Sequence, residues 1–326
     1  MINEEYWIFD EKAVTNDKYG CHPSNRSITE LLDSGIILVN KPSGPTSHQL
    51  TAWARNLLGL NRLGHGGTLD PFATGLLTLL CGKATKITNI VLNSNKSYVA
   101  VIRFGKPVLE DELNDLLKKL TGEIYNVPPK ESAVKIQVRS RFIFSNKLLD
   151  LDESGKIAII QLSCNAGTYV RTLTKDFGLI LGTNCDLIEL HRDETGIFEE
   201  NMACTMHQLT DAVFLWQNQG DDRGLKQIMA PIESILNNLP RIYVKDGAVS
   251  AVSHGAPLAK PGIVKASKGI KKGDSVIILS LKEEAVAIAT LHVDSENLME
   301  MANGQVATAQ SVLMAPGTYP QTWATK

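Results

Sequence analysis

The sequence contains few cysteines, and none of them is placed to bind a metal. Five Cys residues are scattered over 326 positions without a C-x-x-C pair, and the seven His residues show no H-x-x-x-H spacing. A zinc site is therefore not expected, and no other metal site or cofactor is predicted. An odd, dispersed set of cysteines also suits a reducing compartment.

Long apolar runs are missing as well. No stretch of about 18 apolar residues is present, so no transmembrane helix is expected. The first six residues lack both the basic and the apolar part of a secretory signal. With 43% hydrophobic and 21% charged residues, the composition is typical of a globular protein, here predicted to be cytoplasmic.

A basic excess, the usual sign of a nucleic-acid-binding domain, is also absent. The formal net charge is -2. Asp and Glu exceed Lys and Arg by four up to residue 240, and Lys and Arg exceed them by two beyond it. Any RNA binding must therefore come from local patches or be shared with basic partner proteins.

The segment from Gly82 to Lys86 resembles a phosphate-binding loop only superficially. That motif requires Gly at the position of Leu77 and Ser or Thr at the position of Ala84. We therefore interpret the segment as a basic turn that faces solvent or RNA.

The most informative stretch is the glycine-rich segment 64–75, which carries Asp70 directly before Pro71. Glycines allow sharp turns and close approach, and a proline favours an extended residue before it. Taken alone, the pattern fits either a rigid loop that presents a carboxylate at a cleft or an ordinary turn with a solvated Asp.

The rest of the chain alternates short strands and amphipathic helices. Strands are expected at 35–40, 98–104, 142–144, 157–164 and 186–190, and helices at 50–58, 113–120, 170–181 and 209–216. The sequence Thr46-Ser47-His48-Gln49 has the form of a capping box. From about residue 242 short β-rich runs follow, with a hairpin over 275–291, which favours a small β-barrel. We divide the chain into an N-terminal arm (1–34), a larger domain (35–240) and a small domain (241–326, folded to about 315).

In combination, several motifs resemble the dyskerin and TruB superfamily of pseudouridine synthases. They are Asn40 to Ser47, Gly64 to Pro71, Lys96-Ser97-Tyr98, Pro128-Pro129 with Ser132 to Lys135, and Gly167 to Arg171. His254-Gly255-Ala256-Pro257-Leu258 resembles a PUA domain, a small RNA-binding barrel. The resemblance implies an α+β pseudouridine synthase fold, with a mixed, mainly antiparallel sheet flanked by helices and loops, plus the PUA β-barrel.

Within the superfamily, the sequence is most similar to the archaeal catalytic subunit of the H/ACA ribonucleoprotein. The segment from Tyr98 to Thr121 has no room for the long insertion with which bacterial members grip tRNA, and a Lys-rich C-terminal tail is absent. A eukaryotic source would instead imply a nucleolar protein.

The resemblance assigns roles to individual residues. It places Asp70 at the reacting sugar or base, as nucleophile or as base, with Arg171 as its charge partner. Tyr98 would stack on uracil and assist proton removal at C5, and His65 would fill the place of the flipped nucleotide. The remaining residues form three groups: pocket lining (Tyr169, Leu190, Lys135), RNA contact (Arg62, Arg192, and His254, Gly255, Ala256 and Pro257 of the PUA domain) and loop support (Lys41, Pro42).

Without the resemblance, each residue also has an ordinary explanation, such as a surface Arg171, a sheet-packed Tyr98, a turn His65 or a core Leu190. The chain also departs from the family pattern. Gly66 replaces a small side chain, which should loosen the loop, and Phe72 stands where H/ACA members often have Lys.

Three functions stay open. The main hypothesis is a uridine isomerase that acts on rRNA and is guided by H/ACA RNA. The expected partners are the guide RNA, a small catalytic-face protein, a small β-barrel protein and a kink-turn-binding protein. The first alternative is a stand-alone tRNA T-loop pseudouridine synthase, and the second is an RNA-binding scaffold without activity. Isomerisation consumes no energy and involves no redox step, so it needs no cofactor.

Overall fold

The computed structural model describes residues 5–129 and 135–321. The chain forms two compact units. The central unit contains residues 37–80 and 88–228, and the terminal unit contains the residues up to 36, 81–87 and those from 229 onward. The Ser132-Ala133-Val134 part of the motif noted above lies outside the described residues.

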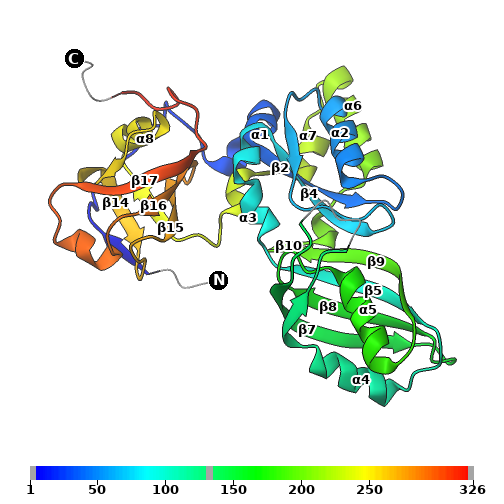
Figure 1. Ribbon diagram of the computed structural model, residues 1–326. Helices are drawn as coiled ribbons and strands as arrows, with labels where there is room; N and C mark the ends of the chain where they lie inside the picture. The colour runs from blue at the N-terminus through cyan, green and yellow to red at the C-terminus, as the bar shows by residue number, and fades with distance from the viewer. Residues whose placement is uncertain (1–4, 130–134, 322–326) are drawn as a thin grey trace. The chain divides into compact units, whose positions relative to one another are not determined.

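The elements of the central unit follow the expected alternation of strands and helices, seen in the lower and right parts of Figure 1. Its strands are β2 (Gly35–Lys41), β3 (Leu63–His65), β4 (Thr74–Cys81), β5 (Lys96–Phe104), β6 (Gly122–Asn126), β7 (Arg139–Leu151), β8 (Ile157–Cys164), β9 (Cys185–Thr195) and β10 (Phe198–Glu199). Its helices are α2 (Ser47–Leu57), α3 (Thr88–Leu92), α4 (Glu110–Lys119), α5 (Val170–Leu181), α6 (Met206–Gln219) and α7 (Arg223–Ile228).

These strands form one mixed, mainly antiparallel sheet with the order β2-β4-β9-β5-β8-β7-β6. β5 pairs antiparallel with both β8 and β9, and β4 pairs parallel with β9 at Thr74 and Gly75. In Figure 1, α5 lies in front of β5 and β8, and α4 lies beside β7; both helices share one buried core with these strands. Leu69 and Ala73, which flank the Asp70 turn, belong to the same core, so the loop is anchored in the packed interior.

Two local predictions can be followed to their structural basis. The capping box begins α2, because the Thr46 hydroxyl accepts the Gln49 N–H at 3.1 Å while the Gln49 side chain accepts the Thr46 N–H at 2.9 Å. Helix α5 spans the predicted residues 170–181 and ends at Gly182, whose φ of 62° is left-handed. Strand β7, expected as three residues, is 13 residues long.

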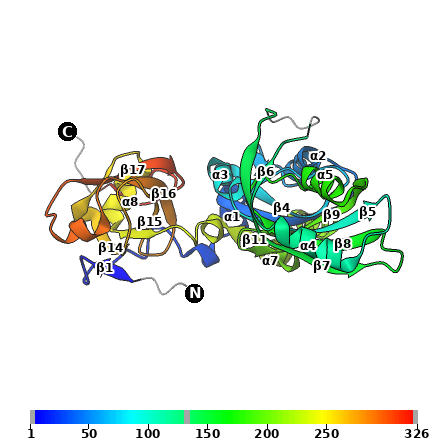
Figure 2. The same ribbon diagram turned by 60° about the horizontal axis from the view of Figure 1, so that its bottom comes forward.

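The terminal unit combines both ends of the described chain in a seven-stranded sheet of order β1-β14-β12-β15-β16-β17-β13. Its elements are β1 (Tyr6–Ile8), α1 (Ile28–Ser34), β11 (Met229–Pro231), β12 (Arg241–Val244), α8 (Asp246–Ser253), β13 (Leu258–Ala259), β14 (Ile263–Ser267), β15 (Ser275–Leu279), β16 (Ala285–Leu291) and β17 (Gln305–Val312). The predicted hairpin is β15 paired with β16. The predicted arm contributes β1, which lies beside β14 in Figure 2.

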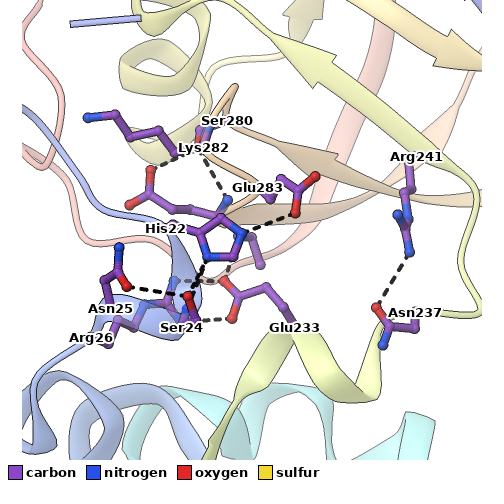
Figure 3. A network of polar contacts seen from close by, with 12 residues as sticks. His22, Ser24, Asn25, Arg26, Glu233, Asn237, Arg241, Ser280, Lys282 and Glu283 are labelled. Atoms are coloured by element: carbon purple, nitrogen blue, oxygen red, sulfur yellow. Dashed lines mark hydrogen bonds and ion pairs between the residues drawn. The ribbon is translucent and has the colours of Figure 1, made fainter. Parts of the chain in front are cut away.

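The N-terminal segment is also held by charged side chains (Figure 3). Arg26 donates both terminal nitrogens to Glu233, at 2.8 and 2.7 Å, and the backbone N–H of Ala285 donates to the same carboxylate. His22 lies 3.3 Å from Glu283. The buried carboxylate of Glu284 accepts from the Cys21 N–H. These contacts join the segment before α1 to the strands of the terminal unit. The three-part division of the chain stays a prediction.

Candidate active site

The loop that carries Asp70 is fixed from the side of α2 by one buried hydroxyl. Ser47 Oγ accepts the N–H of Leu69 at 2.9 Å and donates to the carbonyl of the same residue at 3.2 Å. On the far side of the turn, the Gly44 N–H donates to the Pro71 carbonyl at 2.8 Å. The residues before and after Asp70 are therefore both tied to the segment 44–47.

Lys41 supports the same loop with its ammonium group. Its fully buried ammonium donates to the carbonyls of Pro42, Pro71 and Ala73 at 2.9, 3.1 and 2.7 Å. Burial lowers the pKa of Lys41, and the negative charge of Asp70 opposes this shift. The three carbonyls satisfy all three donors of the ammonium, whereas the Pro42 ring is exposed and supplies only its carbonyl.

The Asp70 carboxylate meets a guanidinium from the start of α5. Arg171 Nη2 donates to Asp70 Oδ2 at 2.6 Å, and the two side chains are 31% and 43% exposed. The Arg171 guanidinium also lies over the Phe72 ring, 5.6 Å from its centroid. Phe72, which removes a Lys of the family pattern, thus provides a face on which Arg171 rests. The arrangement pairs the Asp70 carboxylate with a cation and leaves it accessible from solvent.

The beginning of α5 is itself positioned by Asn126, the last residue of β6. The Asn126 side chain accepts the N–H of Tyr169 at 2.8 Å and donates to its carbonyl at 3.3 Å. Thr172 Oγ1 donates to the carbonyl of Val127 at 2.8 Å. Tyr169 is half-buried at the N-cap position, two residues before Arg171. Leu190 on β9 is only 7% exposed and packs in the core beneath.

Tyr98 lies on β5 and is half-buried. Burial raises the pKa of its hydroxyl above the ordinary value, and the nearby Arg192 charge and a hydrogen bond to it act in the opposite direction. The hydroxyl is therefore protonated at neutral pH. Asp70 also contributes to this pKa shift by raising it, which places the carboxylate and the phenol in one electrostatic neighbourhood.

His65 lies on β3 against a second histidine. Its ring meets that of His48 edge-on, with centroids 4.8 Å apart. Burial, followed by His48 and Arg192, lowers the pKa of His65 to about 4, so the imidazole is neutral at pH 7. An RNA contact by His65 would therefore use its ring or a neutral hydrogen bond, whereas the neighbouring exposed Arg62 can supply positive charge.

The expectation that Arg192 contacts RNA is wrong, because its side chain is 2% exposed. Its Nε donates to the Leu76 carbonyl at 2.7 Å, and Nη2 donates to the Gly67 carbonyl at 3.2 Å. Gly66 leaves no gap in the packing, and the loosening of the loop expected there stays a prediction. An added Cβ there would lie 2.2 Å from Val91 Cγ1, so Val91 already fills the space.

The remaining predicted residues lie elsewhere. Lys135 is exposed in the loop between β6 and β7. In the terminal unit, His254, Gly255, Ala256 and Pro257 form an exposed run after α8, open to a partner. Sequence reasoning gave no role to Ser47, although its place one residue after the helix cap is the signal that could have found it.

In residues 5–129 and 135–321, no group of three or more His, Cys, Asp or Glu side chains could hold a metal ion. Over the same ranges, no helix is long and apolar enough to cross a membrane.

Together, the mixed sheet, the loop aspartate with its arginine partner and the appended small sheet domain define an RNA pseudouridine synthase with a PUA domain. The chain belongs to the TruB family of pseudouridine synthases. Residues 55–170 match the N-terminal domain of TruB family pseudouridylate synthases, and 171–237 match a C-terminal domain of tRNA pseudouridylate synthase B. Residues 240–313 match the PUA domain, and residues 2–51 match the DKCLD domain.

Individual relatives agree with the family match over nearly the whole chain. A protein of Methanopyrus kandleri named probable tRNA pseudouridine synthase B is 42% identical over 98% of this chain and 94% of its own length. A chain in the crystal structure of a Cbf5-Nop10-Gar1 complex is 37% identical, with a TM-score of 0.89 and coverage of 98% and 97% of the two chains. A chain of an H/ACA ribonucleoprotein bound to a substrate RNA is 36% identical, with a TM-score of 0.90 and coverage of 99% of this chain and 98% of that chain. The predicted fold and family are confirmed.

Proposed function

We propose that this protein isomerises uridine to pseudouridine in rRNA, at sites selected by an H/ACA guide RNA. The observation that carries the chemistry is the accessible Asp70 carboxylate, held 2.6 Å from Arg171 on a loop whose backbone is tied down on both sides. Such a carboxylate can attack the sugar or the base without first reorganising the loop.

The reaction detaches uracil from C1′, turns it and rejoins it through C5. Asp70 acts as the nucleophile or as the base that starts the detachment, and Arg171 orients its carboxylate by a charge-assisted hydrogen bond. Because the target base is stacked in RNA, it must leave its stack to reach Asp70. Arg62 and the neutral His65 ring lie on the segment leading into the loop and are suited to contact the RNA around the extruded nucleotide.

The guided role is supported by the short connection between β5 and β6. Only α4 and its flanking turns lie between these strands, so the central unit lacks a long tRNA-gripping insertion there. It is supported further by the similarity to chains in complexes with Nop10, Gar1 and H/ACA RNA. The proposed partners are therefore a guide RNA, proteins of the Nop10 and Gar1 types and a kink-turn-binding protein, acting in the cytoplasm of an archaeal-type cell. The exposed run 254–257 would contact the guide RNA.

A stand-alone tRNA enzyme is the second candidate, because curated relatives carry the name tRNA pseudouridine synthase B. One assay separates the candidates. Pseudouridine would be mapped in an rRNA fragment and in a tRNA, each incubated with and without guide RNA and partner proteins. Turnover of the rRNA fragment only with the full set is the expected result. Turnover of tRNA by the bare protein would favour the second candidate, and RNA binding without product in any lane would indicate a scaffold.

A further inference from the structure

Arg192 occupies a central place in the sheet behind the Asp70 loop. Its Cα is paired with that of Gly75 on β4 and with that of Tyr98 on β5. The close strand approach depends on glycine, because a Cβ at Gly75 would lie 2.3 Å from the Arg192 carbonyl oxygen and the φ of Gly75 is 101°. Arg192 is therefore flanked directly by the loop strand and by the tyrosine strand.

The guanidinium connects these elements from inside the protein. Its contacts to the Leu76 and Gly67 carbonyls join β4 to the segment three residues before Asp70. An added Cβ at Gly67 would lie 3.5 Å from Arg192 Nη1, so the guanidinium lies beside this glycine with room for little more than a methyl group between them. In the described part of the chain Arg192 forms no ion pair. It donates to two backbone carbonyls, and its cross-strand pairing with Tyr98 places it beside the phenol, whose pKa its charge lowers.

The buried Arg192 guanidinium, which can only donate hydrogen bonds, restricts the orientation of the Tyr98 hydroxyl beside it. Arginine offers five N–H donors and no acceptor, so toward Tyr98 it can only donate to the phenolic oxygen. Donation fixes that oxygen and directs the hydroxyl hydrogen away from the guanidinium. It also favours release of the hydroxyl's own proton, because the cation stabilises the negative charge that this release leaves on the oxygen.

We propose that Arg192 is a positioning residue for the last chemical step, in which the Tyr98 oxygen takes the proton from C5. This inference rests on the proposed isomerase function. After C1′ has bonded to C5, that carbon carries a surplus proton. The C5–H bonding pair returns to the ring as the Tyr98 oxygen accepts the proton and passes its own to water. N1 of the base takes up one proton from water, so the reaction stays an isomerisation.

The test compares two target RNAs, one with uridine and one with 5-fluorouridine at the guided position. In 5-fluorouridine, C5 carries no proton to remove, so detachment and rejoining proceed without the step assigned to Tyr98. Because Arg192 also contacts the Asp70 loop, Arg192→Gln should slow both reactions in the complete complex, but the uridine reaction at least about tenfold more than the 5-fluorouridine reaction. Equal slowing of both substrates, or of neither, would overturn the proposal.

Two further variants keep the test decisive. Tyr98→Phe leaves both carbonyl contacts of Arg192 in place and should show the same split between substrates, so wild-type rates on both RNAs would also overturn the proposal. Lys96→Gln is the matched control. Like Arg192 on β9, Lys96 on β5 is a buried cation, and it donates to the carbonyls of Val91, Leu92 and Ser94. Its loss should change both reactions by the same factor. If wild type itself converts neither RNA, the proposed function fails, which is a separate outcome.

Discussion

The two units use buried charge in opposite ways. Among the described residues, four charged side chains are buried, and the three in the central unit are cations: Lys41, Lys96 and Arg192. The fourth is Glu284 in the terminal unit, a carboxylate. The three cations donate to backbone carbonyls, whereas Glu284 accepts from the Cys21 N–H and from the hydroxyls of Ser280 and Tyr319.

This difference follows from what each segment leaves unpaired. Loops and helix ends have carbonyls without backbone partners, as in the Asp70 loop and at the end of α3, and Lys and Arg can only donate. A segment that crosses the strands of another part of the fold brings N–H and hydroxyl donors, which an acceptor-only carboxylate satisfies. The sign of a buried charge thus indicates which groups it stabilises. A buried cation stabilises unpaired carbonyl oxygens, and a buried carboxylate stabilises N–H and hydroxyl donors.

The largest effect is expected where a cation is removed from the Asp70 loop. Lys41→Met keeps the length of the side chain but leaves the carbonyls of Pro42, Pro71 and Ala73 without their donor. The free energy of unfolding should fall by about 2–4 kcal/mol. Urea unfolding measures this, with Lys119→Met on the exposed face of α4 as the control. A decrease in unfolding free energy no greater than that of the control would contradict the claim that the buried Lys41 stabilises the Asp70 loop.

Arg171 differs from the buried cations of the central unit, because it donates to the carboxylate of Asp70 and not to backbone carbonyls. A hydrogen bond to a charged group contributes about 1.5–3 kcal/mol, so Arg171→Met should lower the isomerisation rate about 10- to 100-fold. Stability should change little, since both side chains are partly exposed. Arg103→Met, which removes an exposed ion pair with Asp186, is the control. Equal rates for the two variants would show that Asp70 does not need its partner.

A smaller effect is expected in the terminal unit. Glu284→Gln keeps the shape of the side chain but replaces one acceptor oxygen by a donor facing Ser280 and Tyr319. The free energy of unfolding should fall by about 1–2 kcal/mol, with isomerisation on bound substrate unchanged. Glu283→Gln is the adjacent control, because its side chain is 57% exposed and its contact to His22 is solvated. A loss shared by both variants would mean that burial of the carboxylate is not the cause.

The smallest effect concerns pH. Because the pKa of His65 is about 4 in the folded chain and 6.5 ordinarily, the unfolded chain takes up a proton in this window that the folded chain does not. The free energy of unfolding should therefore fall as pH decreases from about 7 to 4, by about 0.7 kcal/mol between pH 7 and pH 6. His65→Asn should remove this part of the pH dependence, and His207→Asn, on the exposed surface of α6, should retain it. An identical pH profile for wild type and His65→Asn would contradict the shift.

Much of the local structure could be predicted, because it depends on short-range patterns. The capping box at Thr46, the helix 170–181 with its terminal glycine and the hairpin of β15 and β16 each follow from neighbouring residues. The family resemblance then singled out Asp70 and Arg171, which the structure brings together from positions 101 residues apart.

What could not be predicted depends on long-range packing. A polar arginine in an acidic run is expected at the surface, and only the register of β9 between β4 and β5 turns Arg192 inward. Likewise, nothing local shows that Phe72 lies under Arg171 or that β1 pairs with β14. In each case the decisive partner is distant in sequence.

The decisive measurement is pseudouridine formation by Asp70→Asn in the complete complex, on an RNA with one guided uridine. Asparagine has nearly the same shape but cannot act as nucleophile or base. The expected result is no detectable pseudouridine, a loss of at least about 10³-fold, with RNA binding and folding retained. Isomerisation at the wild-type rate would contradict the assignment of Asp70 as the reacting carboxylate, and with it the role of the loop that Lys41, Ser47 and Arg192 hold in place.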